Sequence, residues 1–189
     1  MDKKIKLTVV LASTREGRRG KKVADWFLPI VRADDKFEVT FADLAEYDLP
    51  YSLDFIEPSE REDKKYPDPN VQRWSDTIEN SEALIFITSE YNHAMPASLK
   101  NAIDQIYWEW LEKPVGFIGY GGRGGGGDSI DSLRHTIETL KWQVAEPKVL
   151  IRGIKKIIDE EGNLTDMAEH EESAKQMLDN LAASFDSTN

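Results

Sequence analysis

The stretch Ala83-Leu84-Ile85-Phe86-Ile87-Thr88 is an almost unbroken apolar run with polar residues on both sides. Such a run is typical of a central strand in a parallel sheet, because helices cover both faces of that sheet and bury every side chain. Pro114 to Tyr120 has the same character, and Ile5 to Ala12 is rich in aliphatic and β-branched residues. We therefore expect these three segments to form the buried centre of one sheet.

The segments between these strands have the character of helices. The sequence predicts helices over 21–32, 70–81, 96–110, 128–142 and 167–185, with further strands over 37–42 and 149–151. Parallel strands need crossover connections, and these connections are right-handed. Residues 1–189 are therefore expected to form a single flavodoxin-like α/β domain. This fold is a three-layer sandwich whose five-stranded parallel sheet has the order 2-1-3-4-5, with helices on both faces.

The composition excludes several classes of protein. The formal net charge is −11 and the isoelectric point is about 4.8, which disfavours a nucleic-acid partner. No apolar run approaches the ~20 residues that cross a bilayer, so we expect no membrane partner. The chain has no cysteine, which excludes disulfides, thiolate catalysis and iron–sulfur ligation. We expect a cytoplasmic protein.

A long polar stretch, 43–69, interrupts the alternation of strands and helices. It holds four prolines and the charge run 60–65, and no hydrophobic period is visible in it. A loop of this length in a compact domain is usually functional or mobile, and a disordered insertion fits the composition equally well.

The segment after the first strand, Ala12 to Gly20, carries hydroxyl groups, glycines and three arginines immediately before a helix. Hydroxyls, guanidinium groups and the backbone N–H groups of a helix N-terminus are the groups that bind phosphate. The alternative is a loop of solvated basic residues that leads into the helix. Neither the Walker motif nor the Gly-x-Gly-x-x-Gly motif is present, so the sequence predicts a phosphate site of another kind.

The segment after the third strand is the most specific in the chain. Ser89-Glu90-Tyr91-Asn92-His93 and the following Leu99-Lys100-Asn101-Ala102-Ile103-Asp104 closely resemble the Pro-Glu-Tyr-Asn loop and Leu-Lys-Asn-Ala-Ile-Asp helix of the NADPH-dependent FMN reductase family. The resemblance extends to the first loop, where the family has Gly-Ser-x-Arg, and to the Tyr-Gly-Gly after the fourth strand. It covers residues 5 to about 150.

The resemblance implies which residues hold the cofactor, FMN. The phosphate is expected at Ser13, Arg15, Arg18 and Gly20, the isoalloxazine at Glu90, Tyr91, Asn92 and His93, and the same ring at Tyr120, Gly121 and Gly122. Three features depart from the family pattern. Ala12 replaces a glycine, Ser89 replaces a proline, and the glycine run after Arg123 is expected to be unusually flexible. Arg123 itself fits either an anion contact, such as the 2′-phosphate of NADPH, or an exposed loop charge.

The resemblance also implies an activity. NADPH or NADH is expected to pass a hydride to N5 of FMN, and two electrons then go to small acceptors such as quinones, azo dyes, chromate or free flavin. The cofactor carries the chemistry, so no catalytic side chain is predicted. The aromatic cluster 107–110 is predicted to form a subunit interface of a homodimer or homotetramer. Two alternatives are an electron carrier like a flavodoxin and a flavin-free relative with a regulatory role.

Two further patterns resemble functional motifs, a lipase block and a histidine metal site. Gly127-Asp128-Ser129-Ile130 resembles a lipase block, but Asp128 and Ser129 are better interpreted as a helix N-cap. The three histidines, His93, His135 and His170, are too scattered in the sequence to indicate a metal site.

Overall fold

The computed structural model describes residues 3–51 and 54–186. Its sheet is parallel and has the strand order β2-β1-β3-β4-β5, with β6 also paired to β4. The strands are β1 (Ile5–Leu11), β2 (Phe37–Asp43), β3 (Ala83–Ser89), β4 (Pro114–Tyr120), β5 (Gln143–Val144) and β6 (Val149–Ile151). The predicted flavodoxin-like topology is thus confirmed, with one additional short strand.

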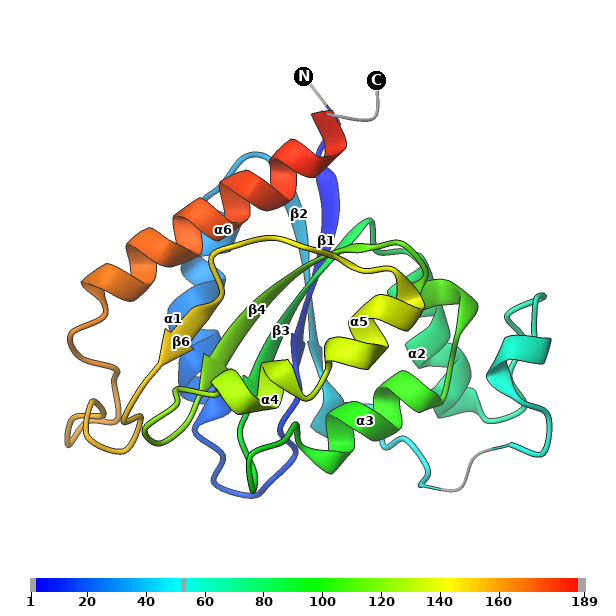
Figure 1. The fold of residues 1–189 in the computed structure, drawn as a ribbon, viewed down its shortest axis with the longest axis horizontal. Helices are drawn as coiled ribbons and strands as arrows, with labels where there is room; N and C mark the ends of the chain where they lie inside the picture. Colours follow the sequence, from blue (N-terminus) through cyan, green and yellow to red (C-terminus); the bar gives the residue numbers. More distant parts are fainter. Residues whose placement is uncertain (1–2, 52–53, 187–189) are drawn as a thin grey trace.

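Helices cover both faces of the sheet and give the three layers seen in Figure 1. One face carries α1 (Gly20–Arg32) and α6 (Ala168–Asp186). The other carries α2 (Pro69–Glu79), α3 (Ala97–Asp104), α4 (Gly127–Asp131) and α5 (Arg134–Leu140). Every residue of β3 is buried, as its apolar run predicts, because both faces are covered.

Two predicted helices are shorter than expected. The helix predicted over 96–110 ends at Asp104, and a 3-10 turn follows at Trp108–Trp110. The helix predicted over 128–142 is divided into α4 and α5 at Ser132 and Leu133. The Ser132 hydroxyl donates to the carbonyl of Ser129 and accepts from the backbone N–H of Met95, and such local bonds compete with a continuous helix.

The predicted fifth strand occupies two positions along one edge of β4. β5 pairs with Pro114 and Val115 at the beginning of β4, whereas β6 pairs with Ile118 to Tyr120 at its end. Pro147 lies between the two strands, and proline cannot donate a ladder hydrogen bond. The fifth position is therefore divided rather than continuous.

The polar stretch 43–69 packs against the domain over the part that the structure describes. Tyr66 is buried and its hydroxyl donates to the buried carboxylate of Glu109, which also accepts from Ser75. Two 3-10 turns, Leu44–Glu46 and Pro58–Glu60, add local structure. The interpretation as a disordered insertion is therefore wrong for these residues. No helix among the described residues is long and apolar enough to cross a membrane.

Candidate functional site

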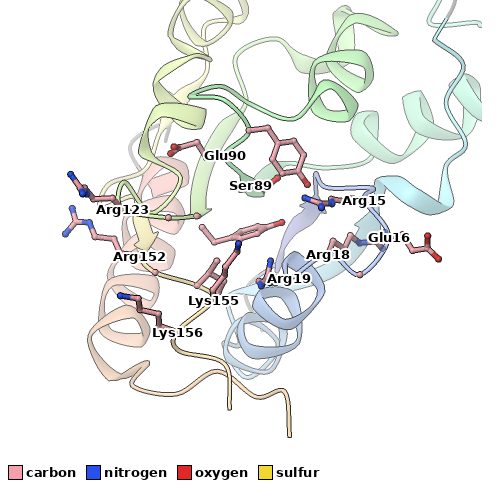
Figure 2. A pocket seen from close by; sticks show the side chains of 17 residues that line it. Arg15, Glu16, Arg18, Arg19, Ser89, Glu90, Arg123, Arg152, Lys155 and Lys156 are labelled. Carbon is pink, nitrogen blue, oxygen red and sulfur yellow. The ribbon is translucent and has the colours of Figure 1, made fainter. Parts of the chain in front are cut away.

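A pocket of about 730 Å³ opens where β1, β3, β4 and β6 end. Its walls are the segments 15–19, 89–91, 120–123 and 152–156, each of which follows one of these strands (Figure 2). Ligands of open α/β sheets bind beyond the carboxyl ends of the strands, near the point where the strand order reverses. The pocket between the loops after β1 and β3 lies at that point.

The loop after β1 presents phosphate-binding groups at the start of α1. Gly17 has a φ of +64°, and the N–H of Arg18 donates to the carbonyl of Arg15 across the turn. No side chain of the described residues caps the N-terminus of α1. The N–H groups of Lys22 and Val23 donate to the carbonyl of Arg19, so those of Gly20 and Lys21 are the ones placed to bind an anion. Arg15 is exposed, whereas Arg18 pairs with the buried carboxylate of Asp43. Arg15 is consequently the freer of the two guanidinium groups.

The loop after β3 folds into a tight hairpin. Tyr91 and Ala94 exchange two backbone hydrogen bonds of 3.0 and 3.1 Å, and Asn92 and His93 between them have φ values of +50° and +61°. Two successive positive φ values are typical of a type I′ turn, which Asn favours at its first position. The Tyr91 hydroxyl lies 2.8 Å from the Ser13 hydroxyl, so this hairpin is hydrogen-bonded to the loop after β1.

The glycines after β4 are packed rather than open. Gly126 has a φ of +88°, and a Cβ there would lie 2.5 Å from the backbone nitrogen of Tyr120. Gly125 is also buried with a positive φ, so these two glycines are packed, and the expectation that the run is unusually flexible stays a prediction. Gly122 differs, because a Cβ there would meet nothing within 4 Å. The loop therefore packs against the domain at Gly125 and Gly126 and is open beside the pocket at Gly122.

Buried polar atoms without partners concentrate at this pocket. Of the buried side-chain atoms in the described residues that lack a hydrogen bond, four belong to its walls. They are Arg18 Nε, Ser89 Oγ, Glu90 Oε2 and Tyr120 Oη. Burial raises the pKa of Tyr120, whereas the neighbouring Ser89 and Ser13 hydroxyls lower it. The phenol is protonated at neutral pH in any case and can donate a hydrogen bond. Because buried polar groups are normally satisfied, these atoms fit a polar ligand such as FMN.

The pocket is basic although the chain is acidic. Seven Lys or Arg side chains line it, against the carboxylates of Glu16 and Glu90 (Figure 2). Among the residues that the structure describes, only Arg18 of these seven forms an ion pair. A concave surface with uncompensated positive charge attracts anionic ligands.

Most of the residues predicted from the sequence meet here. Those that line the pocket are Arg15, Arg18, Glu90, Tyr91, Tyr120, Gly121 and Gly122. Ser13 and Gly20 lie behind its wall, since Ser13 is buried beneath Tyr91 and a Cβ on Gly20 would clash with the Tyr120 hydroxyl. This contact places the Tyr120 hydroxyl next to the start of α1. Asn92 and His93 do not line it and are exposed at the tip of the hairpin.

The turn 152–156 is the part of the site that the sequence analysis missed. It contributes Arg152, Lys155 and Lys156, and it follows a strand of only three residues. A feature of the sequence could have indicated this turn, because its three basic residues come directly after the predicted strand 149–151 in a chain that is acidic overall. Arg19 also lines the pocket, although the resemblance assigned it no role.

The structure also shows where the residues of the lipase-like block and His93 lie. The N-cap of α4 is Gly126, so the prediction that Asp128 and Ser129 cap this helix is wrong. Ser129 is fully buried and hydrogen-bonds to Thr88, which removes it as an accessible nucleophile. Asp128 instead accepts a hydrogen bond from His93, and this bond raises the pKa of the imidazole. Potential ligand atoms of Glu90, His93 and Asp128 lie within 4.8 Å of one another. The spacing of the histidines along the chain gave no indication of this group.

The aromatic cluster 107–110 is divided between core and surface. Trp110 is completely buried and packs against Trp74, Phe86 and Trp142, so the interpretation as an interface residue is wrong for Trp110. Tyr107 and Trp108 are half-buried.

Comparisons with known proteins agree with this architecture. The structure of a flavoenzyme NAD(P)H:(acceptor) oxidoreductase from Paracoccus denitrificans superposes with a TM-score of 0.71 at 21% identity, covering 95% of this chain and 98% of that one. Flavodoxin 1 from Bacillus cereus gives a TM-score of 0.54 at 16% identity, over 94% of this chain and 97% of that one. These structures show the shared fold.

Sequence comparisons show the family. An NAD(P)H-dependent FMN reductase from Schizosaccharomyces pombe is 33% identical, over 74% of this chain and 69% of that protein. A quinone reductase from Pseudomonas putida is 27% identical, over 85% of this chain and 84% of that protein. The family model described as NADPH-dependent FMN reductase matches residues 5–155. The chain therefore belongs to the NADPH-dependent FMN reductase family and is an oxidoreductase that uses FMN and NAD(P)H.

Proposed function

We propose that this protein binds FMN in the pocket at the ends of β1, β3 and β4 and uses NAD(P)H to reduce small acceptors of the quinone type. The observation that carries the proposal is the set of four buried polar atoms without partners, all on the walls of one basic pocket. Bound FMN would supply the chemistry, accepting a hydride from NAD(P)H at N5 and passing on two electrons.

The residues of the chain supply binding and orientation. Arg15 and the uncapped start of α1 are placed to hold the phosphate, and the Tyr120 hydroxyl, close to Gly20, can donate to the same end of the cofactor. Ser13 positions Tyr91 through the hydrogen bond between their hydroxyls. Gly122 adds no side chain to the wall, and a Cβ there would meet nothing within 4 Å, which supports room for a planar molecule beside it.

The same open wall supports a permissive acceptor site. Strong discrimination between substrates requires polar groups that the wrong substrate leaves unpaired, and Gly121 and Gly122 add no such side chain between Tyr120 and Arg123, although charged side chains line the rest of the pocket. The quinone reductases among the relatives support quinones as one class of acceptor. We expect several quinones to be reduced with comparable kcat/KM.

The decisive experiment is the absorption spectrum of the purified protein, recorded with FMN before and after addition of NADPH without oxygen. The proposal predicts a flavin spectrum that NADPH bleaches and that a quinone restores. An electron carrier would bind FMN but would not be bleached by NADPH alone. A protein that leaves the FMN spectrum and fluorescence unchanged would contradict the proposal.

We also propose that the protein is a homo-oligomer, a dimer or a tetramer. Large apolar side chains are exposed at Tyr51, Phe55 and Ile56, and Phe55 is completely exposed. Large apolar side chains exposed within one short stretch of chain favour an interaction surface. A monomeric mass by light scattering at micromolar concentration, with full activity, would refute this.

A further inference from the structure

The basic turn 152–156 forms the end of the pocket opposite Arg15. In Figure 2, Arg15 and Arg18 lie on one side, whereas Arg152 and Lys156 lie on the other and Lys155 lies between Lys156 and Arg19. FMN carries one phosphate, and the loop after β1 already provides for it. The positive charge at the far end is therefore left without a role in holding FMN.

The turn is held in place by backbone hydrogen bonds rather than by its side chains. Gly153 N–H donates to the carbonyl of Gly122 over 2.8 Å, and Ile154 N–H donates to that of Gly121 over 3.1 Å. Lys156 N–H closes the turn on the carbonyl of Gly153 over 2.7 Å. These bonds continue the pairing of β4 with β6 beyond the strands, so the basic turn has a fixed position beside the open glycine wall.

The basic side chains of this turn have no anionic partner in the described part of the chain. Arg152, Lys155 and Lys156 form no ion pair, although the net charge of the protein is −11. All three are exposed and reach the pocket. Three like charges on one short turn repel one another, and an anion of high charge would relieve that repulsion. A phosphate monoester carries roughly −1.5 to −2 charges at neutral pH and is such an anion.

We propose that Arg152, Lys155 and Lys156 bind the 2′-phosphate of NADPH and give the enzyme its preference for NADPH over NADH. The inference rests on the proposed function, in which the coenzyme enters this pocket. The two coenzymes differ only in that phosphate, so the far end of the pocket is where they can be distinguished.

The test compares wild type with the double variant Lys155→Gln/Lys156→Gln. The control is Lys141→Gln/Lys175→Gln, which removes the same charge from exposed pairs outside the pocket. Calorimetry measures the binding of adenosine 2′,5′-bisphosphate, 5′-AMP and inorganic phosphate to each protein. Wild type and control should bind the bisphosphate at least ~10-fold more tightly than 5′-AMP, and the double variant should lose that difference.

The kinetic arm measures kcat/KM for both coenzymes with FMN present. The double variant should lose ~10- to 100-fold with NADPH and less than ~3-fold with NADH, while its affinity for FMN stays that of wild type. Equal binding of the bisphosphate and 5′-AMP by wild type would overturn the inference, as would inorganic phosphate binding as tightly as the bisphosphate. Failure to bind FMN would refute the proposed function instead, and the calorimetric arm would still decide the nucleotide site.

Discussion

Gly20→Ala tests the close contact between the start of α1 and the end of β4. A Cβ at this position would meet the Tyr120 hydroxyl first, and it would lie 2.8 Å from Leu11 Cδ1 and 3.0 Å from Tyr120 Cζ. Leu11 and Tyr120 are both buried, so neither side chain can move into solvent. Overpacking of this kind costs ~1–3 kcal/mol, and the better helix propensity of alanine offsets up to ~1 kcal/mol of it.

The expected net loss of ~1–2 kcal/mol corresponds to a Tm lower by ~2–8 °C for a chain of this size. Thermal unfolding without FMN measures this loss, and a fluorescence titration should show FMN binding ~10-fold more weakly, because Tyr120 is displaced. Gly122→Ala is the matched control, since nothing lies within 4 Å of its Cβ, and its stability should stay within ~0.5 kcal/mol of wild type. Adding Tyr120→Phe to Gly20→Ala should restore part of the loss by removing the clashing oxygen. A Gly20→Ala protein that unfolds at the wild-type temperature would refute the reasoning.

Three further predictions concern the charged residues around the pocket. Arg15→Ala should weaken FMN binding by ~10- to 100-fold in a titration at low salt. The Tm should stay unchanged, because Arg15 is exposed and makes no ion pair with any residue that the structure describes; unaltered affinity would remove it from the phosphate site. Arg18→Ala should instead destabilise the fold by ~1–3 kcal/mol in chemical denaturation, because the buried Asp43 carboxylate would lose its charged partner and keep only the N–H of Ala45; an unchanged stability would contradict this. The pKa of His93 is raised, chiefly by its hydrogen bond to Asp128. With Asp128 ionised, the stabilisation from this pair is therefore fully present below the unfolded pKa of histidine and is lost as pH rises through the raised pKa. An NMR titration of the imidazole should show the pKa of His93 falling in Asp128→Asn, and an equal pKa in both proteins would rule the pair out.

The strands were predictable because burial on both faces leaves a clear pattern in the sequence. The apolar run from Ala83 became β3 with its start unchanged, and Pro114 to Tyr120 became β4 with the same bounds. The ends of the helices were not predictable in the same way. Glu109 fits a helical pattern locally, but its carboxylate accepts hydrogen bonds from Ser75 and Tyr66, far away in the sequence. Such tertiary contacts override local propensity, and a single sequence does not display them.

Some parts of the candidate site could likewise be predicted from the sequence, and others could not. Loops that follow long strands could be placed, since the ends of parallel strands meet at one edge of the sheet. Asn92 and His93 stand at the tip of a type I′ turn, which depends on the hairpin between Tyr91 and Ala94, and they do not line the pocket. Their role at the isoalloxazine stays a prediction. The turn 152–156 was missed because its position depends on backbone bonds to Gly121 and Gly122. Residue type alone gives no sign of those bonds.

The division of the fifth strand position has a consequence for how copies of this protein can meet. A continuous strand at the border of a sheet offers a template on which another chain can add by backbone pairing. Here that border consists of two residues in β5 and three in β6, separated by Pro147, and it offers no long uninterrupted ladder. Growth of the sheet into a fibrous aggregate is discouraged on this side. Molecules that approach one another here must associate through side chains, whose chemistry can be selective, rather than through backbone pairing, which any sequence can provide.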